Sequence, residues 1–325
     1  MAISGNAALD QQSHINDLVA KHEVEKHPRA TTPMQPNVKF SKEQCPEDGS
    51  AEQQRMKGRD YAGLIGPLLH ACNTRPDIQY AVNTLSTFMA RPAEVHWDAA
   101  RRILACLRDT KDLKLAYSRD VEASPLKTCF AATSKDTREK VGLWEKVRKT
   151  LPILGFSDSA WGDNENSCST TGTLMLVGLG GVSWMSKCQP TVALSSTEAE
   201  YMAASAVVED ALFLRHLFED LQFPIPGPIT IYEGNSGCVK WAEGQGSHKR
   251  IRHLDLRKNF LREAVESALV KIEWLPTSLQ LAGILTKALD RSTFETLRTY
   301  LLGGPNVAPQ ENVQLHELTP SSNTN

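Results

Sequence analysis

The feature that most constrains the fold is the order of strand and helix signals in the second half of the chain. Three apolar stretches come first, with hairpin-like glycines before the third, and a long helix and then alternating strands and helices follow. This order predicts an α/β fold (an α+β mixed sheet) with five strands and flanking helices. The predicted strands are 153–158, 171–177, 182–184, 228–232 and 269–275, and the predicted helices are 195–221, 235–243, 253–267, 279–289 and 293–302.

The rest of the chain differs in character from this half. The first 60 residues are polar and broken by prolines, and three stretches of helical periodicity then form a small helical segment ahead of the sheet. The last residues are polar, and we expect disorder there. The predicted divisions are 1–60, a polar segment and linker; 61–118, the helical segment; 119–150, a charged insert or loop; 151–290, the sheet-bearing domain; and 291–325, a last helix and tail.

Composition narrows the class of protein. The 36 basic and 38 acidic residues give a net charge of −2, which does not indicate a polyanionic partner for the whole molecule. Seven cysteines without any Cys-x-x-Cys pair argue against a disulfide framework or a zinc finger. The chain has no apolar run of about 18–20 residues and no basic-then-apolar start. We therefore expect an intracellular protein, whether cytoplasmic or nuclear.

Several ordered motifs resemble the C-terminal part of copia-type retrotransposon Pol polyproteins, over about 270 residues. Residues 12–42 are similar to the polymerase tail, which makes 1–60 a remnant of that tail with a linker, and 61–118 is similar to the connection segment. The chain has no Asp-Asp pair, so we expect no reverse transcriptase active site. The motifs are Asn-Thr-Arg-Pro-Asp-Ile (73–78), Phe-Ser-Asp-Ser-Ala-Trp (156–161), Gln-Pro-Thr-Val-Ala-Leu-Ser-Ser-Thr-Glu-Ala-Glu-Tyr (189–201), Arg-His-Leu-Asp-Leu-Arg (252–257) and Ile-Leu-Thr-Lys (284–287).

The resemblance implies a ribonuclease H-like domain. That family hydrolyses the RNA strand of RNA–DNA hybrids with two Mg²⁺ or Mn²⁺ ions about 4 Å apart, held by four carboxylates. Asp158 matches the first carboxylate position and Glu200 the second, so both are the predicted catalytic and metal-binding residues. Glu198 lies about 200° around the helix from Glu200 and fits better as a capping carboxylate in the first turn.

The third and fourth carboxylate positions fall on Gly234 and Gly283. Glu233 is one residue from the third position, and because side chains alternate along a strand it should point away from the site. Gly283 falls within a predicted helix, where glycine costs about 1 kcal/mol relative to alanine. With two of four ligands lost, we expect metal binding to be weak or absent and nuclease activity to be weak or absent.

A basic stretch offers the predicted nucleic-acid contacts. Residues 247–262 carry six lysines and arginines against one aspartate, a pattern suited to phosphate contacts that position a backbone without reading sequence. Trp184, Trp241 and Trp274 are expected in the core. The predicted contact residues are Lys249, Arg250, Arg252, His253, Arg257 and Lys258.

Three functions remain in competition. The first is a degenerate polyprotein fragment that keeps the ribonuclease H fold and binds RNA–DNA hybrids weakly. The second is an active ribonuclease H with a relaxed metal site that uses Glu233. The third is a non-enzymatic domain co-opted for binding nucleic acid or protein. In intact relatives, the resemblance implies that the polymerase part of the parent polyprotein is a further partner.

Overall fold

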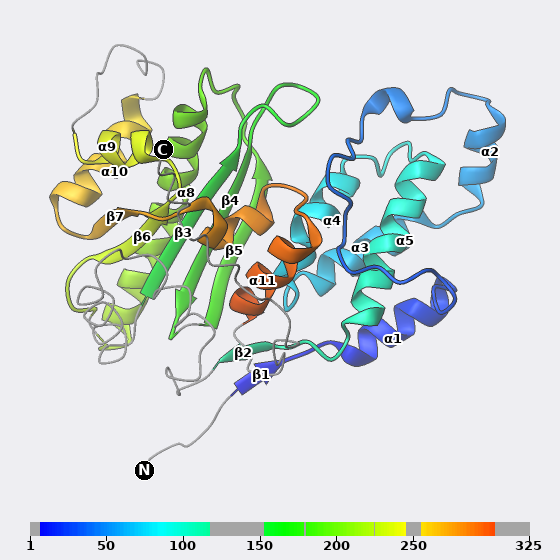
Figure 1. Ribbon diagram of the computed structural model, residues 1–325, viewed down its shortest axis with the longest axis horizontal. Helices are drawn as coiled ribbons and strands as arrows, with labels where there is room; N and C mark the ends of the chain where they lie inside the picture. The colour runs from blue at the N-terminus through cyan, green and yellow to red at the C-terminus, as the bar shows by residue number, and fades with distance from the viewer. Residues whose placement is uncertain (1–6, 118–152, 179, 224, 245–254, 303–325) are drawn as a thin grey trace, which may run out of the picture.

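The computed structural model describes residues 7–117, 153–178, 180–223, 225–244 and 255–302; the predicted insert at 119–150 and the end of the chain beyond residue 302 lie outside them. A sheet with its helices stands beside a helical part built from the first third of the chain (Figure 1). In the described part of the chain, no helix is both long and apolar enough to cross a membrane.

The sheet has five strands in the order β5-β4-β3-β6-β7. The first three strands along the chain form an antiparallel meander, and β6 and β7 then extend the sheet parallel to β3. The predicted mixed five-stranded sheet is therefore confirmed. The third strand is longer than predicted, because the glycines at its start lie within the strand. The bounds are β3 (Ile153–Ala160), β4 (Thr170–Val177), β5 (Gly180–Cys188), β6 (Ile229–Glu233) and β7 (Val270–Trp274).

Helices pack on both faces of this sheet. One face lies against α8 (Ser196–Asp220), α9 (Ser236–Ala242) and α10 (Asp255–Glu266), with an apolar core between them. The other face packs against a 3₁₀ turn, η7 (Leu281–Leu285), and against α11 (Arg291–Leu302), and includes Phe156 in its core. Because successive strand residues point to opposite faces, each central strand supplies both cores.

The predicted helix over residues 279–289 is not a helix of that length. The chain forms two short 3₁₀ turns, η6 (Thr277–Leu279) and η7, so Gly283 lies in a 3₁₀ turn rather than in an α-helix interior. All five residues of η7 are buried against the sheet. Tertiary packing of this short apolar run, rather than helix propensity, therefore determines its conformation.

Gly172 is what lets η7 lie so close to the sheet. A Cβ at this position of β4 would stand 2.6 Å from a methyl carbon of Thr286 and 2.7 Å from the carbonyl oxygen of Ala282. Those separations are too short for any side chain. In the β3–β4 ladder Gly172 is the partner of Asp158, so η7 packs directly beside that aspartate.

The helical part has an apolar core of its own. Residues from the first 34 positions, including Ile15 and Val24, join this core together with α3, α4 and α5. A two-stranded ribbon, β1 with β2, was not predicted and ties the start of the described chain to the end of this part. Its elements are β1 (Ala7–Leu9), α1 (Gln12–Lys21), η1 (Lys42–Gln44), α2 (Ala51–Lys57), α3 (Tyr61–Ala71), η2 (Pro76–Ile78), α4 (Gln79–Ser86), α5 (Glu94–Asp109) and β2 (Leu115–Tyr117).

The helical part covers the edge strand β5. The indole N–H of Trp184 donates to the carbonyl of Cys72 at 3.1 Å, and the Asn83 amide donates to the carbonyl of Ser186 at 2.6 Å. The Tyr117 hydroxyl donates to the Gly181 carbonyl at 2.7 Å. These bonds occupy polar groups on an edge that would otherwise be available for pairing with another strand.

A buried ion pair anchors the turn that begins α4. The Arg75 guanidinium donates twice to the Asp77 carboxylate, at 2.8 and 2.7 Å, and both side chains are almost fully buried. Removing the carboxylate would leave an unpaired buried cation.

We therefore expect Asp77→Ala to lower the free energy of unfolding by about 3–5 kcal/mol, measured by urea denaturation. Arg291→Ala removes an exposed pair with Glu295, and it should change the free energy of unfolding by less than about 0.5 kcal/mol. Equal effects of the two substitutions would contradict this prediction.

Candidate functional site

Asp158 lies near the end of β3, on the face covered by η7. It is 4% exposed. Its Oδ2 accepts a hydrogen bond from the Thr286 hydroxyl and lies 3.2 Å from the ammonium nitrogen of Lys287. This oxygen is therefore already held by two groups from the segment that follows η7.

The beginning of α8 positions Glu200. Ser195 caps the helix by accepting the backbone N–H of Glu198 at 3.2 Å. The Glu198 carboxylate turns back and accepts the N–H of Leu194 at 3.0 Å. The predicted capping role of Glu198 is thus confirmed, and Glu200 is left as the carboxylate of this turn that faces the sheet.

Glu200 is held in an environment that disfavours its charge. Burial, followed by the nearby carboxyls of Glu233 and Asp158, raises its pKa far above the ordinary range. Its Oε2 is buried and has no hydrogen-bond partner among the described residues. The structure thus brings Asp158 and Glu200, predicted from motifs 42 residues apart, close enough to interact electrostatically.

Glu233 ends β6 and is fully buried. In the ladder it pairs with Ser157 rather than with Asp158. Because side chains alternate along a strand, Glu233 points to the face opposite that of Asp158. One of its oxygens accepts the Ser157 hydroxyl at 2.7 Å and the other accepts the N–H of Asn235 at 3.0 Å. Both oxygens therefore serve structural hydrogen bonds.

The two glycine positions have room for a side chain. A Cβ on Gly234 would meet nothing nearer than the carbonyl oxygen of Leu275, at 4.0 Å. A Cβ on Gly283 would stand 3.8 Å from Oδ2 of Asp158 and 3.9 Å from Cε of Lys287. A Cβ at either position would meet no steric barrier, and at position 283 it would stand beside Asp158.

The residues present do not fit a pair of divalent ions. Two such ions need several clustered carboxylate oxygens. In the described ranges, no group of three or more His, Cys, Asp or Glu side chains is arranged to hold a metal ion. One of the two Asp158 oxygens, Oδ2, is bound by Thr286 and Lys287.

Sequence reasoning missed the roles of Thr286 and Lys287. Both belong to the motif at 284–287, which was used there only to recognise a family. Their spacing from Gly283 contained a usable signal, because a hydroxyl and an ammonium three and four residues on can reach the same place as a side chain at 283.

Four of the predicted nucleic-acid contacts, Lys249, Arg250, Arg252 and His253, lie outside the described residues, as do the side chains of Arg257 and Lys258.

The tryptophans are divided between core and surface. Trp184 and Trp241 are partly buried against the sheet cores, as expected. The expected burial of Trp274 is wrong, because it ends β7 with 53% of its surface exposed. Trp161, just after β3, is 55% exposed. Each of these two exposed indoles donates its N–H at 3.0 Å to a backbone carbonyl, of Gly234 and of Ala193 respectively.

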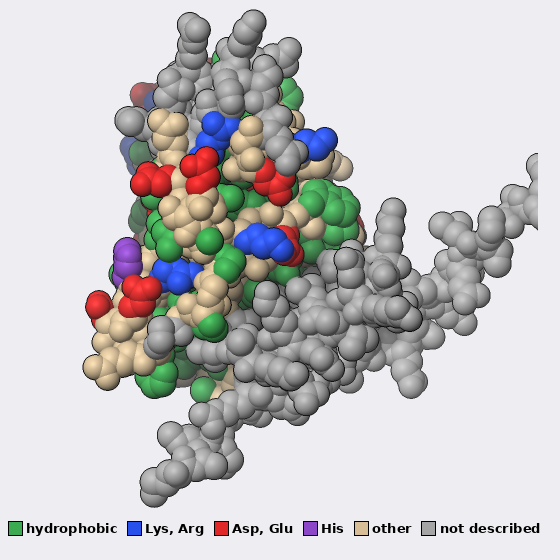
Figure 2. Space-filling model, turned by 90° about the vertical axis from the view of Figure 1, so that its left-hand side faces the viewer, with side chains coloured by type: hydrophobic (Ala, Val, Ile, Leu, Met, Phe, Trp, Pro, Cys, Tyr) green, Lys and Arg blue, Asp and Glu red, His purple; other side chains and the backbone are tan. Residues whose placement is uncertain are grey.

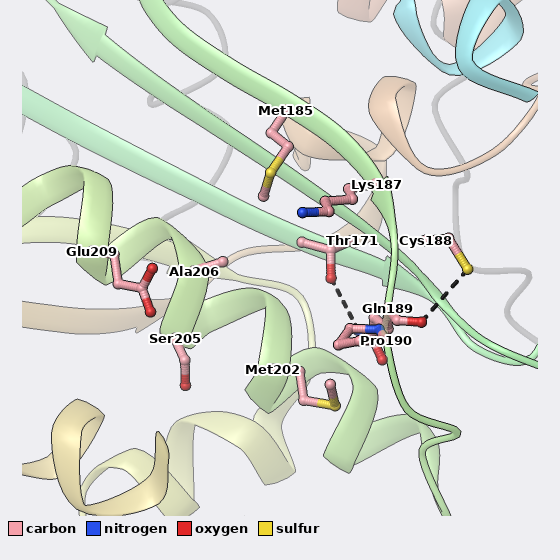
Figure 3. A pocket seen from close by; sticks show the side chains of 10 residues that line it. All are labelled: Thr171, Met185, Lys187, Cys188, Gln189, Pro190, Met202, Ser205, Ala206 and Glu209. Carbon is pink, nitrogen blue, oxygen red and sulfur yellow. Dashed lines mark hydrogen bonds between the residues drawn. The ribbon is translucent and has the colours of Figure 1, made fainter. Parts of the chain in front are cut away.

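A cleft of about 250 Å³ lies between α8 and the strands β4 and β5 (Figure 3). Lys187 and Glu209 come from its strand and helix walls. Gln189 is buried beside it and donates to the Thr171 hydroxyl at 3.0 Å and to the Ala199 carbonyl at 2.9 Å. Gln189 therefore fastens the start of α8 to β4, and the cleft does not include the carboxyls of the candidate site.

The strand order β5-β4-β3-β6-β7, with helices on both faces, agrees with the ribonuclease H-like fold that the resemblance implies. Comparisons with known proteins identify the wider family. The chain is 31% identical over 288 residues to the retrovirus-related Pol polyprotein from transposon RE1 of Arabidopsis thaliana, and 30% identical over 291 residues to that from transposon TNT 1-94 of Nicotiana tabacum. Each alignment covers 88% of this chain. The chain is therefore homologous to a part of the retrovirus-related Pol polyproteins of copia-type transposons.

The chain spans less than a fifth of the length of these relatives, 17% and 19% respectively. No profile of a known protein family matches it. Among solved structures it is similar to the N-terminal RNase H domain of a Mycobacterium tuberculosis protein, solved as a fusion with maltose-binding protein. That similarity has a TM-score of 0.33 at 15% identity, and it covers 46% of this chain and 96% of the solved one.

The buried carboxyls predict a pH dependence of stability. Burial raises the pKa of Glu233 to about 8, and the charge of Asp158 adds to the effect. The folded state therefore holds a proton that the unfolded state has released above about pH 4.3. Stability from this group is present below that pH and is lost as the pH rises towards 8, by at most about 1.4 kcal/mol per pH unit.

Glu233→Gln keeps an acceptor for Asn235 and removes the titration. We expect the unfolding free energy of the variant, relative to the native chain, to improve as the pH rises from 5 to about 8. Denaturant unfolding at a series of pH values measures this. Parallel profiles for the two proteins would contradict it.

Proposed function

We propose that this chain keeps the ribonuclease H-like domain of a copia-type polyprotein as a binder of RNA–DNA hybrids, with little or no cleavage of the RNA strand. The observation that carries the proposal is the state of the carboxylate positions. Two of the four positions implied by the resemblance are Gly234 and Gly283, and the retained Asp158 is paired with Lys287. Mg²⁺ or Mn²⁺ binding is accordingly weak or lost.

Charge requirements support the loss of cleavage. Two-metal hydrolysis needs one ion to activate water and a second to stabilise the leaving oxygen. Asp158 and Glu200 supply too few oxygens for two ions, and Lys287 already occupies one oxygen of Asp158. Glu233 offers no ready replacement, since Ser157 and Asn235 hold both of its oxygens.

Exposed rings support retained binding. Trp161 comes three residues after Asp158, just beyond the end of β3, and Trp274 pairs with Glu233 at the end of β7. Both therefore lie at the end of the sheet that carries the carboxyls. Their anchored N–H groups hold the rings in place. Flat aromatic faces of this kind stack on bases without sequence preference. The basic residues at 249–258 would add phosphate contacts.

The visible face beside β7 carries charges of both signs. Lysines and arginines are interspersed there with acidic residues, and apolar side chains show between them (Figure 2). We therefore assign the electrostatic part of hybrid binding to Lys249, Arg250, Arg252, His253, Arg257 and Lys258. Hybrid binding without cleavage would also suit a domain co-opted for use outside its polyprotein. In intact relatives, the protein partner of this domain would be the polymerase part of the polyprotein.

Cleavage of a labelled RNA–DNA hybrid in Mg²⁺ or Mn²⁺ tests the first half of the proposal. We expect no measurable turnover from the native chain. The double substitution Gly234→Asp with Gly283→Asp restores two carboxylates at positions with room for them, so it should raise metal affinity and turnover. Turnover by the native chain that Asp158→Asn abolishes would refute the proposed inactivity and favour a relaxed site.

Hybrid binding tests the second half. Trp161→Ala should weaken binding of a fluorescent hybrid by roughly 5- to 100-fold, the loss of one stacked base, measured by fluorescence anisotropy. Trp161→Phe should retain most of the affinity because it keeps a ring. Phe213→Ala is the matched control, because it removes another exposed ring (66% exposed, against 55% for Trp161) from α8, 13 residues after Glu200. An unchanged affinity in Trp161→Ala would contradict the stacking role.

A further inference from the structure

We propose that the ammonium group of Lys287 is a resident cation of the carboxyl site, which holds β3 and the η7 segment together in the place where relatives would bind a metal ion. The inference goes beyond the proposed function, because it concerns what stabilises the site without any nucleic acid. It starts from the disagreement between the residues present and a two-metal centre.

The contacts of Lys287 are specific. Its Nζ lies 3.2 Å from Oδ2 of Asp158, whose side chain is 6% exposed, while the lysine side chain is 38% exposed. The lysine stem passes the empty position of Gly283, 3.9 Å from where a Cβ would stand. The Thr286 hydroxyl donates its one proton to the same aspartate oxygen, and its Oγ1 also lies 3.1 Å from the Gly283 carbonyl oxygen. Two consecutive residues thus converge on one oxygen.

The surroundings of this oxygen are otherwise acidic. Asp158 and Glu233 both act electrostatically on Glu200, and the Lys287 charge acts on it in the opposite sense. Among the described residues, the Lys287–Asp158 contact is the one ion pair that involves any of these three carboxyls. A single fixed positive charge therefore faces a group of acids that would repel one another when ionised.

The lost side chain at 283 gives Lys287 this position. A carboxylate there would start from a Cβ 3.8 Å from Oδ2 of Asp158 and 3.9 Å from Cε of Lys287, and it would attract the ammonium to itself. With glycine at 283 the ammonium reaches Asp158 directly. A divalent ion and Lys287 then compete for the same oxygen, and the lysine, being covalently attached, has the entropic advantage.

Thermal unfolding of the full chain, with and without millimolar MgCl₂ at matched ionic strength, tests the inference. The native chain should show no shift of the melting temperature with Mg²⁺. Lys287→Met should melt about 2–4 °C lower without the metal and should regain part of that loss with Mg²⁺, because the acids then lack a cation. Lys287→Arg should behave like the native chain.

Lys271→Met is the matched control, since it removes a lysine from an exposed pair with Glu273 on β7. It should shift neither melting temperature nor metal response. The inference is overturned if Lys287→Met behaves like Lys271→Met, or if Mg²⁺ raises the native melting temperature as much as that of Lys287→Met.

Gly283→Asp keeps Lys287 and provides a second test should Lys287→Met fail to fold. Its melting temperature should rise with Mg²⁺, and an unchanged response would count against the competition. None of these measurements uses a hybrid. The role of Lys287 can therefore be refuted while the proposed hybrid binding without cleavage stands, and the proposed function can be refuted while the role of Lys287 stands.

Discussion

The close approach of η7 to the sheet at Gly172 is the constraint on which the candidate site depends. A side chain at that position of β4 would collide with Thr286 and with the backbone of Ala282. Without that approach neither Thr286 nor Lys287 would reach Asp158, and the apolar residues of η7 would not be buried against β3 and β4. Close backbone packing at Gly172 thus places η7 over one apolar core and, at the same point, brings Thr286 and Lys287 to Asp158.

Much of the fold could be predicted because its signals are local. Strand alternation, the glycines around the β4–β5 turn and the Ser195–Glu198 cap each depend on neighbouring residues, and they predict the five strands and the long helix. The segment at 279–289 was misjudged for the opposite reason. Its apolar pattern is also compatible with a helix, and only contact with Gly172 favours a short 3₁₀ turn.

The candidate site was predictable only where its signals are also local. Asp158 and Glu200 come from motifs, and their proximity follows from the order of strands. The pairing of Lys287 with Asp158 joins residues 129 positions apart, and no periodicity reports such a contact. Likewise, the exposure of Trp274 depends on its place at the end of the edge strand β7, which the order of strands decides.

The coverage of β5 has a consequence for how the chain can be divided. Hydrogen bonds from Trp184, Asn83 and Tyr117 join the helical part to this strand. A fragment that began after residue 118 would expose a nine-residue edge strand and its free carbonyls, a template for pairing between copies. The helical part therefore shields this edge strand, and we expect the two parts to stay soluble as one unit.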